Sequence, residues 1–147
     1  MWGRRGWRSV LALLGFILLI GIGPTARGED RQIYQVVMHL NSDDEKEQRG
    51  LLGNIHHLYE AVGRKHLRVE VVAHGGGLKL LTRKESRFAR ELTELKARFG
   101  VEFTACSNTM KKLNLTREDL LDQVDRTVPA MVRLMELQEQ GWAYIKP

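Results

Sequence analysis

Three stretches of the chain consist mainly of apolar and β-branched residues, and a polar or glycine-rich turn follows each of them. They cover residues 33–40, 67–74 and 101–106. Runs of this length without a clear polar face are typical of strands that are buried on both sides of a sheet. We therefore predict three buried strands at these positions.

Between these runs, apolar residues recur at steps of four, three and four positions. The spacing occurs within 51–62 and again within 88–99, and it predicts two helices with one apolar face each. Gly63 and Gly100 directly follow the two segments and predict the helix ends. Strands and helices that alternate in this way predict a parallel sheet with right-handed crossovers.

The last third of the chain contains shorter elements and one more long helix. Pro129 is suited to a helix start, and the apolar residues after it cover more than one narrow stripe of the helix. Such a helix is expected to bury a second face against another subunit. The predicted elements are a short helix at 110–115, a capped turn from Thr116, a strand at 124–128, the long helix at 130–140 and a strand at 142–145.

Length and charge limit the classes of protein that remain. The chain has 147 residues, which is enough for one α/β domain with its own core. The formal net charge is +5, but four of the 23 basic residues lie in the first 28 positions, where there is no acidic residue. The rest of the chain has 19 basic and 18 acidic residues, a net charge of +1. We therefore expect no nucleic-acid partner.

The first residues have the pattern of an export signal. A basic segment at 1–8 precedes a short apolar stretch at 10–22, which is too short for a full membrane span. Small residues before Glu29 predict cleavage there, so we expect a signal peptide at 1–28 and a mature domain at 29–147. This predicts export to the bacterial periplasm. The alternative is an uncleaved segment that anchors the domain in the inner membrane, facing the periplasm.

Cys106 is the only cysteine and the first candidate for chemistry. It ends a predicted strand, and the polar residues Ser107, Asn108 and Thr109 that follow are suited to a helix start. The thiol would then lie at the carboxyl edge of the sheet, where ligands commonly bind, and beside a helix terminus that favours the thiolate. A free cysteine is also a common small core residue, so packing is the alternative. One cysteine cannot form a disulfide within the chain.

Two histidines end predicted strands at the same edge of the sheet. His39 and His74 are candidates to donate a proton at Cys106 or to hold its thiolate as an ion pair. Alternatively, each histidine satisfies a backbone group at its strand end. A zinc site formed by the two histidines and Cys106 would be chemically sensible, but no spacing in the sequence is diagnostic of one, and we expect no metal and no cofactor.

Polar and glycine residues at this edge are candidates for ligand binding. Three consecutive glycines after the second strand permit either a flexible turn or a cradle for a small anion. Backbone amides after Cys106 would bind the negative charge of a transferred sulfur atom. The candidate ligand-binding residues are Asn41, Gly75, Gly76, Gly77, Ser107, Asn108 and Thr109.

The order and spacing of three motifs resemble those of a known family. The motifs are Val37-Met38-His39-Leu40-Asn41, His74-Gly75-Gly76, and residues 105–110 followed by Leu115-Thr116. Together they resemble the DsrE/DsrF-like family of sulfur-relay proteins over residues 33–145, in an uncharacterised, exported branch. The resemblance implies a three-layer α/β/α sandwich with a five-stranded parallel sheet, and assembly into a homotrimer or homohexamer. It also implies that Cys106 corresponds to the position where relay subunits carry a persulfide.

Two functional hypotheses follow from this reasoning. In the first, the protein accepts or relays sulfane sulfur as a persulfide on Cys106, acting as a sulfur carrier or transferase with a donor or acceptor protein. In the second, it is a non-enzymatic oligomeric module that binds a small ligand or supports assembly, and Cys106 is structural. The fold alone does not decide between them, because function depends on the site.

Overall fold

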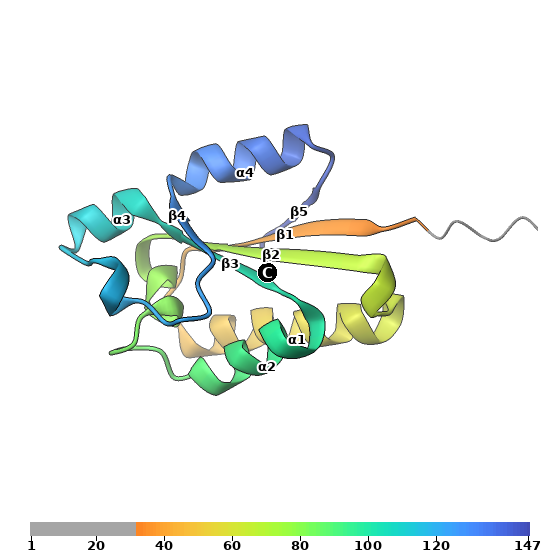
Figure 1. Cartoon of the computed structure of the whole chain (residues 1–147), viewed down its shortest axis with the longest axis horizontal. Helices are drawn as coiled ribbons and strands as arrows, with labels where there is room; N and C mark the ends of the chain where they lie inside the picture. The colour runs from red at the N-terminus through yellow and green to blue at the C-terminus, as the bar shows by residue number, and fades with distance from the viewer. Residues whose placement is uncertain (1–31) are drawn as a thin grey trace, which may run out of the picture. The chain divides into compact units, whose positions relative to one another are not determined.

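A five-stranded, all-parallel sheet forms the centre of the computed structural model, which describes residues 32–147 (Figure 1). The predicted signal peptide at 1–28 lies outside the described residues. The strand order is β4-β3-β2-β1-β5, and every neighbouring pair is parallel, which confirms the expected α/β fold. The strands are β1 (Tyr34–Leu40), β2 (Leu67–Ala73), β3 (Glu102–Cys106), β4 (Arg126–Val128) and β5 (Ala143–Ile145).

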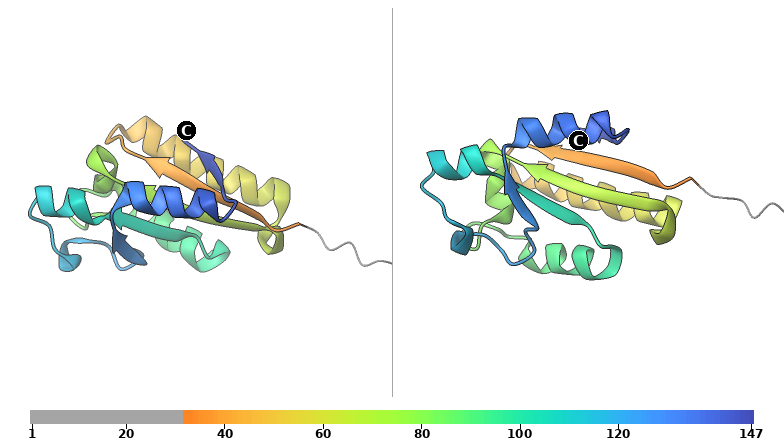
Figure 2. Two further views of the ribbon diagram at one scale, coloured as in Figure 1. Left: turned by 90° about the horizontal axis from the view of Figure 1, so that it is seen from above. Right: turned by 45° about the horizontal axis from the view of Figure 1, so that its top comes forward.

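Helices cover both faces of the sheet. On one face lie α1 (Glu45–Val62) and α2 (Ala89–Phe99), and on the other lies α4 (Ala130–Glu139) (Figures 1 and 2). The short helix α3 (Ser107–Lys112) follows β3 at the carboxyl edge. Among the described residues, no helix is long and apolar enough to cross a membrane.

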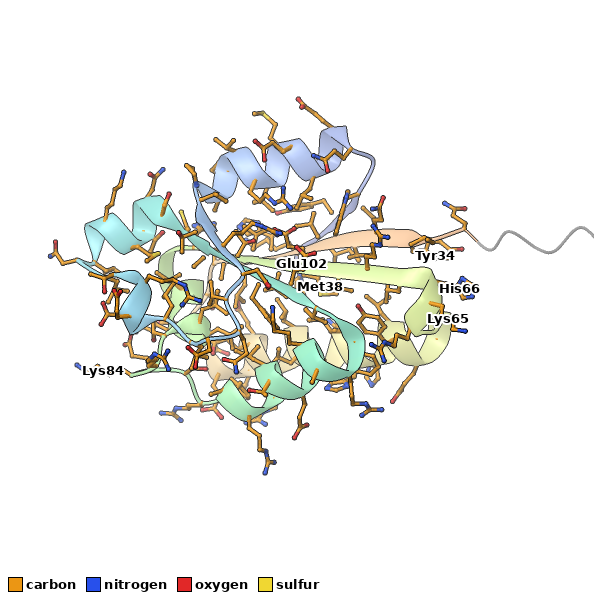
Figure 3. The ribbon with its side chains drawn as sticks, viewed as in Figure 1. Tyr34, Met38, Lys65, His66, Lys84 and Glu102 are labelled. Atoms are coloured by element: carbon orange, nitrogen blue, oxygen red, sulfur yellow. The ribbon has the colours of Figure 1, made fainter. Side chains whose placement is uncertain are left out.

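The two faces of the sheet carry different cores. Alternate residues of β1, such as Val36 and Met38, join the larger apolar core under α1 and α2. Val37 points the other way, into a smaller core under α4. Figure 3 shows Met38 within the molecule, while Lys65 and Lys84 point outward at its two ends. Burial on both faces explains why the strands lack a clear polar side.

The predicted ends of the long helices are confirmed. Asp44 caps α1, and its carboxylate accepts hydrogen bonds from the backbone N–H groups of Lys46 (2.8 Å) and Glu47 (3.1 Å). Gly63 and Gly100 end α1 and α2 with φ angles of 89° and 74°, in a region that glycine adopts without strain. The capping box from Thr116, which has aspartate in the usual place of glutamate, is also present before the 3₁₀ helix η3 (Arg117–Asp119).

Two local predictions differ from the structure. The helix expected at 110–115 is α3, which begins earlier, directly after Cys106. The prediction missed this start because the first turn of the helix is polar and has no apolar periodicity. The glycine triplet begins the 3₁₀ helix η2 (Gly75–Leu81) and is not a simple turn. A second 3₁₀ helix, η1 (Arg64–His66), joins α1 to β2.

Gly77 is required by a close approach between η2 and β1. A Cβ atom at this position would lie 2.5 Å from the Leu40 carbonyl oxygen, well inside van der Waals contact. The backbone there has little freedom to move away, because the same oxygen accepts a hydrogen bond from the His74 N–H at 3.0 Å. The absence of a side chain therefore allows η2 to pack against the end of β1.

We predict that Gly77→Ala lowers the free energy of unfolding by about 2 kcal/mol or more, because the added methyl group overpacks this contact. Urea unfolding of the purified protein measures the change. The matched control is Gly53→Ala within α1, where a Cβ atom meets no heavy atom within 4 Å. This control should be stabilised by roughly 0.5–1 kcal/mol. Equal effects of the two substitutions would contradict the packing argument.

Candidate functional site

Cys106 ends β3, as predicted, and α3 begins directly after it. Its residue exposure is only 5%, and it belongs to the smaller core together with Val37, Val72 and residues of α4. The Sγ atom accepts a hydrogen bond from the backbone N–H of Ala130 at 3.4 Å. The first turn of α4 therefore contacts the sulfur directly.

Opposing effects act on the thiol of Cys106. Burial raises its pKa, because a thiolate is less well solvated in the protein than in water. The Ala130 N–H, the N–H and hydroxyl of Thr109 and the N–H of Asn108 lower it, and together they outweigh burial. The net result is a pKa below the ordinary value of a cysteine, which favours the reactive thiolate.

Thr109 connects the thiol to the glycine triplet. Its hydroxyl oxygen accepts a hydrogen bond from the Gly75 N–H at 3.0 Å, which leaves the hydroxyl proton available for the sulfur. The backbone carbonyl of Asn41 also borders the triplet, and a Cβ atom on Gly76 would lie 3.3 Å from it. The ends of β1, β2 and β3 therefore meet at one edge.

Two N–H groups of the glycine triplet already form hydrogen bonds within the protein, which limits the triplet as an anion-binding site. The Gly75 N–H is bonded to Thr109, and the Gly77 N–H donates to the His74 carbonyl at 3.0 Å. Donors that are already bonded do not bind an anion without breaking these contacts. Ligand binding by the triplet, by the exposed Asn41 and by Ser107, Asn108 and Thr109 stays a prediction.

His39 and His74 form a hydrogen-bonded pair. Their Nε2 atoms lie 2.7 Å apart, and their rings stack with centroids separated by 4.8 Å. The Nδ1 atom of His39 lies 2.5 Å from the hydroxyl oxygen of Tyr144 on β5. One Nε2 atom must donate and the other must accept, so the pair holds a single proton between its rings.

Both histidines stay neutral around pH 7. Burial lowers the pKa of His39 to about 4, and the positive charges of His74, when protonated, and of Lys146 add to this effect. Burial also lowers the pKa of His74, with a further contribution from Lys146. A neutral imidazole donates one hydrogen bond and accepts another, so the pair can hydrogen-bond to a neighbouring group without carrying a charge.

The histidine pair and Cys106 are neighbours by strand register. Ala73 pairs with Ala105, so His74 and Cys106 are the next residues on adjacent strands, which lie about 5 Å apart. Within residues 32–147, neither imidazole forms a hydrogen bond with the Cys106 sulfur. The two histidines therefore lie beside the thiol at the same edge of the sheet but are not bonded to it.

Two parts of this site were not found in the sequence. Tyr144 lies opposite Val37 in the β1–β5 ladder and therefore on the same face as His39, but only the strand order reveals this. The Ala130 N–H is a backbone donor without a sequence motif. Across the described part of the chain, no group of three or more His, Cys, Asp and Glu side chains is suited to hold a metal ion, and this includes the alternative set of His39, His74 and Cys106.

Comparison with known proteins identifies the family. A model of the DsrE/DsrF-like family matches residues 17–147. The chain is also similar to a solved structure, the protein of unknown function MTH1491 from Methanobacterium thermoautotrophicum. The two are 35% identical with a TM-score of 0.72, over 78% of this chain and 99% of that chain. No curated protein matches the chain. Since the family model covers most of its length, the chain belongs to the DsrE/DsrF-like family.

Proposed function

We propose that this protein is a sulfur carrier in which Cys106 accepts a sulfane sulfur atom as a persulfide and passes it on. The observation that carries the proposal is the direct hydrogen bond from the Ala130 N–H to Sγ, which supports the thiolate in a largely buried position. Membership of a family that is generally associated with sulfur relay supports the same chemistry.

The proposed transfer is a nucleophilic displacement at sulfur. The Cys106 thiolate attacks the outer sulfur of a persulfide, polysulfide or thiosulfate donor, and a new S–S bond forms as the donor's S–S bond breaks. The bonding electron pair leaves with the donor, as a thiolate or as sulfite, so no external oxidant is needed. An acceptor thiolate then attacks the outer sulfur and regenerates the Cys106 thiolate.

The groups around Sγ support the charged states of this cycle. The N–H groups of Asn108 and Thr109, which lower the pKa of Cys106, are suited to bind the negative charge of the persulfide. The lowered pKa values of His39 and His74 favour a hydrogen-bonding role over an ion pair with the thiolate. In this proposal the neutral His74 donates a hydrogen bond to the departing thiolate or sulfite, and Tyr144 and His39 hold its ring in place.

A second candidate function is a non-enzymatic oligomeric module in which Cys106 only packs. It is favoured by the 5% exposure of Cys106 and by the exposed apolar side of α4, where Met131 and Met135 are 56% and 55% exposed. These methionines border a groove of about 640 Å³ that His39 and Tyr144 also line. We propose that this face mediates a homotrimer or homohexamer in either case. Export to the periplasm stays a prediction.

We predict that the wild-type protein gains the mass of one sulfur atom after incubation with polysulfide or thiosulfate, and that Cys106→Ser protein does not. At pH 7 the reaction should be about tenfold faster than that of cysteine in an unstructured peptide, because more of the thiol is ionised. Intact-mass spectrometry follows the reaction, and a reductant should reverse it. Wild-type protein that never gains the mass, or gains it no faster than the peptide, would exclude the sulfur-carrier function and leave the second candidate.

We also predict that the histidine pair makes stability depend on pH. Because folding lowers the pKa of His39 from 6.5 to about 4, the unfolded chain binds more protons than the folded protein as the pH falls through this range. The free energy of unfolding should therefore drop by about 1–2 kcal/mol between pH 7 and pH 5, where most carboxylates remain ionised. Urea unfolding at the two pH values measures this drop.

The variant for this experiment is His39→Asn, which removes the buried imidazole and should show a clearly smaller drop. The matched control is His57→Asn, which changes an exposed histidine on α1 and should behave like the wild type. An unchanged drop in His39→Asn protein would refute the assignment of His39 as a buried, neutral imidazole.

A further inference from the structure

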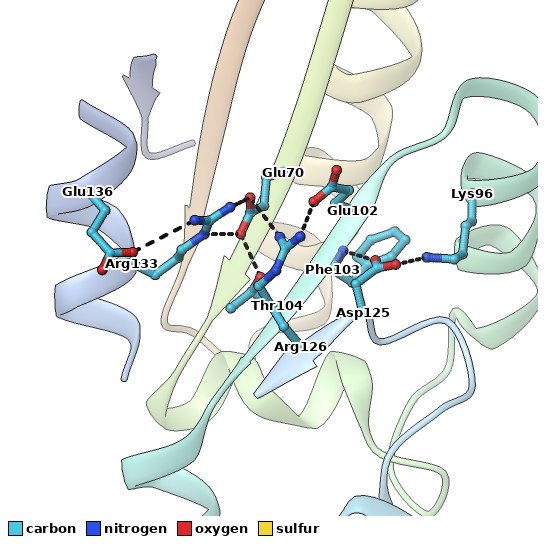
Figure 4. A network of polar contacts seen from close by, with 9 residues as sticks. All are labelled: Glu70, Lys96, Glu102, Phe103, Thr104, Asp125, Arg126, Arg133 and Glu136. Carbon is cyan, nitrogen blue, oxygen red and sulfur yellow. Dashed lines mark hydrogen bonds and ion pairs between the residues drawn. The ribbon is translucent and has the colours of Figure 1, made fainter. Parts of the chain in front are cut away.

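A buried carboxylate lies under α4, on the same face of the sheet as Cys106. Glu70 lies in the middle of β2, between Val69 and Val71, and is fully buried. Its carboxylate accepts two hydrogen bonds from the Arg133 guanidinium of α4, at 2.9 Å and 2.6 Å (Figure 4). Thr104 on β3 donates a third at 2.6 Å. This fork ties the helix to the centre of the sheet.

The charge of Glu70 is maintained by these partners. Burial raises its pKa, but the hydrogen bonds from Arg133 and Thr104 and the nearby charge of Arg126 outweigh burial and lower it. The contact with Arg126 is of poorer geometry. Its Nη1 atom lies 3.0 Å from a Glu70 oxygen but forms no aligned hydrogen bond with any described residue, while its Nη2 atom pairs with Glu102 at 2.6 Å. Arg133 is therefore the principal partner of Glu70.

Arg133 lies in the first turn of α4, three residues after Ala130. Its own backbone N–H donates to the Pro129 carbonyl at 3.0 Å, so the fork and the start of the helix belong to one rigid turn. The Ala130 N–H of that turn is the donor that contacts Sγ. A rotation or shift of this turn relative to β2 would move the donor away from the sulfur.

We propose that Glu70 and Arg133 are positioning residues, which hold the first turn of α4 so that the Ala130 N–H stays in contact with the Cys106 sulfur. The inference deepens the proposed function, since it concerns the same thiol. Arginine is suited to this task because its planar fork fixes direction as well as distance, whereas lysine supplies only a point charge.

The competing explanation is that the β3–β4 ladder alone places Ala130. Cys106 pairs with Val128, only two residues before Ala130. The ladder fixes where the chain leaves β4, but the direction of α4 over the sheet depends on contacts further along the helix. Apolar contacts of Leu134 and Leu137 allow sliding, whereas a bidentate ion pair permits one arrangement. The two explanations therefore differ in what an Arg133 substitution does to the thiol.

The experiment measures the reactivity of Cys106 in the purified full-length protein. The pH dependence of iodoacetamide alkylation, followed by intact mass, gives the thiol pKa and the rate at pH 7. We compare the wild type with Arg133→Met, Arg133→Lys and the double variant Glu70→Gln/Arg133→Met. The double variant removes the carboxylate together with its partner, so it serves if Arg133→Met alone leaves Glu70 unpaired and fails to fold. The matched control is Arg126→Met, which also removes a cation beside Glu70 but lies on β4.

All three Arg133 variants should alkylate about three- to tenfold more slowly at pH 7, with a higher thiol pKa, because a hydrogen bond to the thiolate is lost or weakened. Arg126→Met should keep the wild-type thiol pKa. The inference is overturned if the folded Arg133 variants keep the wild-type thiol pKa, or if Arg126→Met raises it by the same amount. Neither readout requires a persulfide, so a failure of sulfur transfer in the mass experiment would leave this result interpretable.

Discussion

The parallel direction of all five strands is the constraint on which the site depends. Each strand must return through a crossover, so every strand delivers its carboxyl end to the same edge. This is why His39, His74 and Cys106, which are far apart in the sequence, lie close together at the carboxyl ends of β1, β2 and β3. The short turn from Pro129 then begins α4 directly over the end of β3. The site is thus a consequence of topology combined with a few side chains at strand ends.

The two faces of the sheet are stabilised by different kinds of interaction. The face under α1 and α2 is a large apolar core, and it supplies the burial that stabilises the domain. The face under α4 holds a much smaller apolar cluster, which includes Cys106, and three of the five buried polar side chains of the described residues, Glu70, Thr104 and His39. Buried polar groups need partners, so this face relies on directed hydrogen bonds where the other relies on packing. Directed contacts specify geometry more sharply, which suits a reactive group.

The elements could be predicted from the sequence because their periods differ, with continuous apolar runs in the strands and steps of three and four in α1 and α2. The edge position of Cys106 followed from the same pattern. The residues that contact His39, Cys106 and one another at this site were harder to predict. Tyr144 reaches His39 only because β5 lies beside β1, and hydrophobic periodicity contains no strand order. Glu70 and Arg133 are 63 positions apart, and neither forms a motif with its neighbours. The 3₁₀ helix at the glycine triplet had no apolar period to reveal it, and the Ala130 donor is a backbone group.

Burial and hydrogen bonding shift the pKa of the Cys106 thiol in opposite directions, and the donors around Sγ outweigh burial. A cysteine with 5% exposure would normally have a raised pKa and low reactivity. Here neutral N–H and hydroxyl groups from α3 and α4 lower the pKa below its ordinary value without placing a cation beside the sulfur. A neutral donor set stabilises a thiolate and a persulfide anion alike, because both carry one negative charge at nearly the same place. A fixed cation would instead bind either anion tightly and hinder release. For the proposed carrier, which must gain and lose a sulfur atom with similar ease, neutral hydrogen-bond donors are the better solution, and we propose that Glu70 and Arg133 hold one of them, the Ala130 N–H, in place.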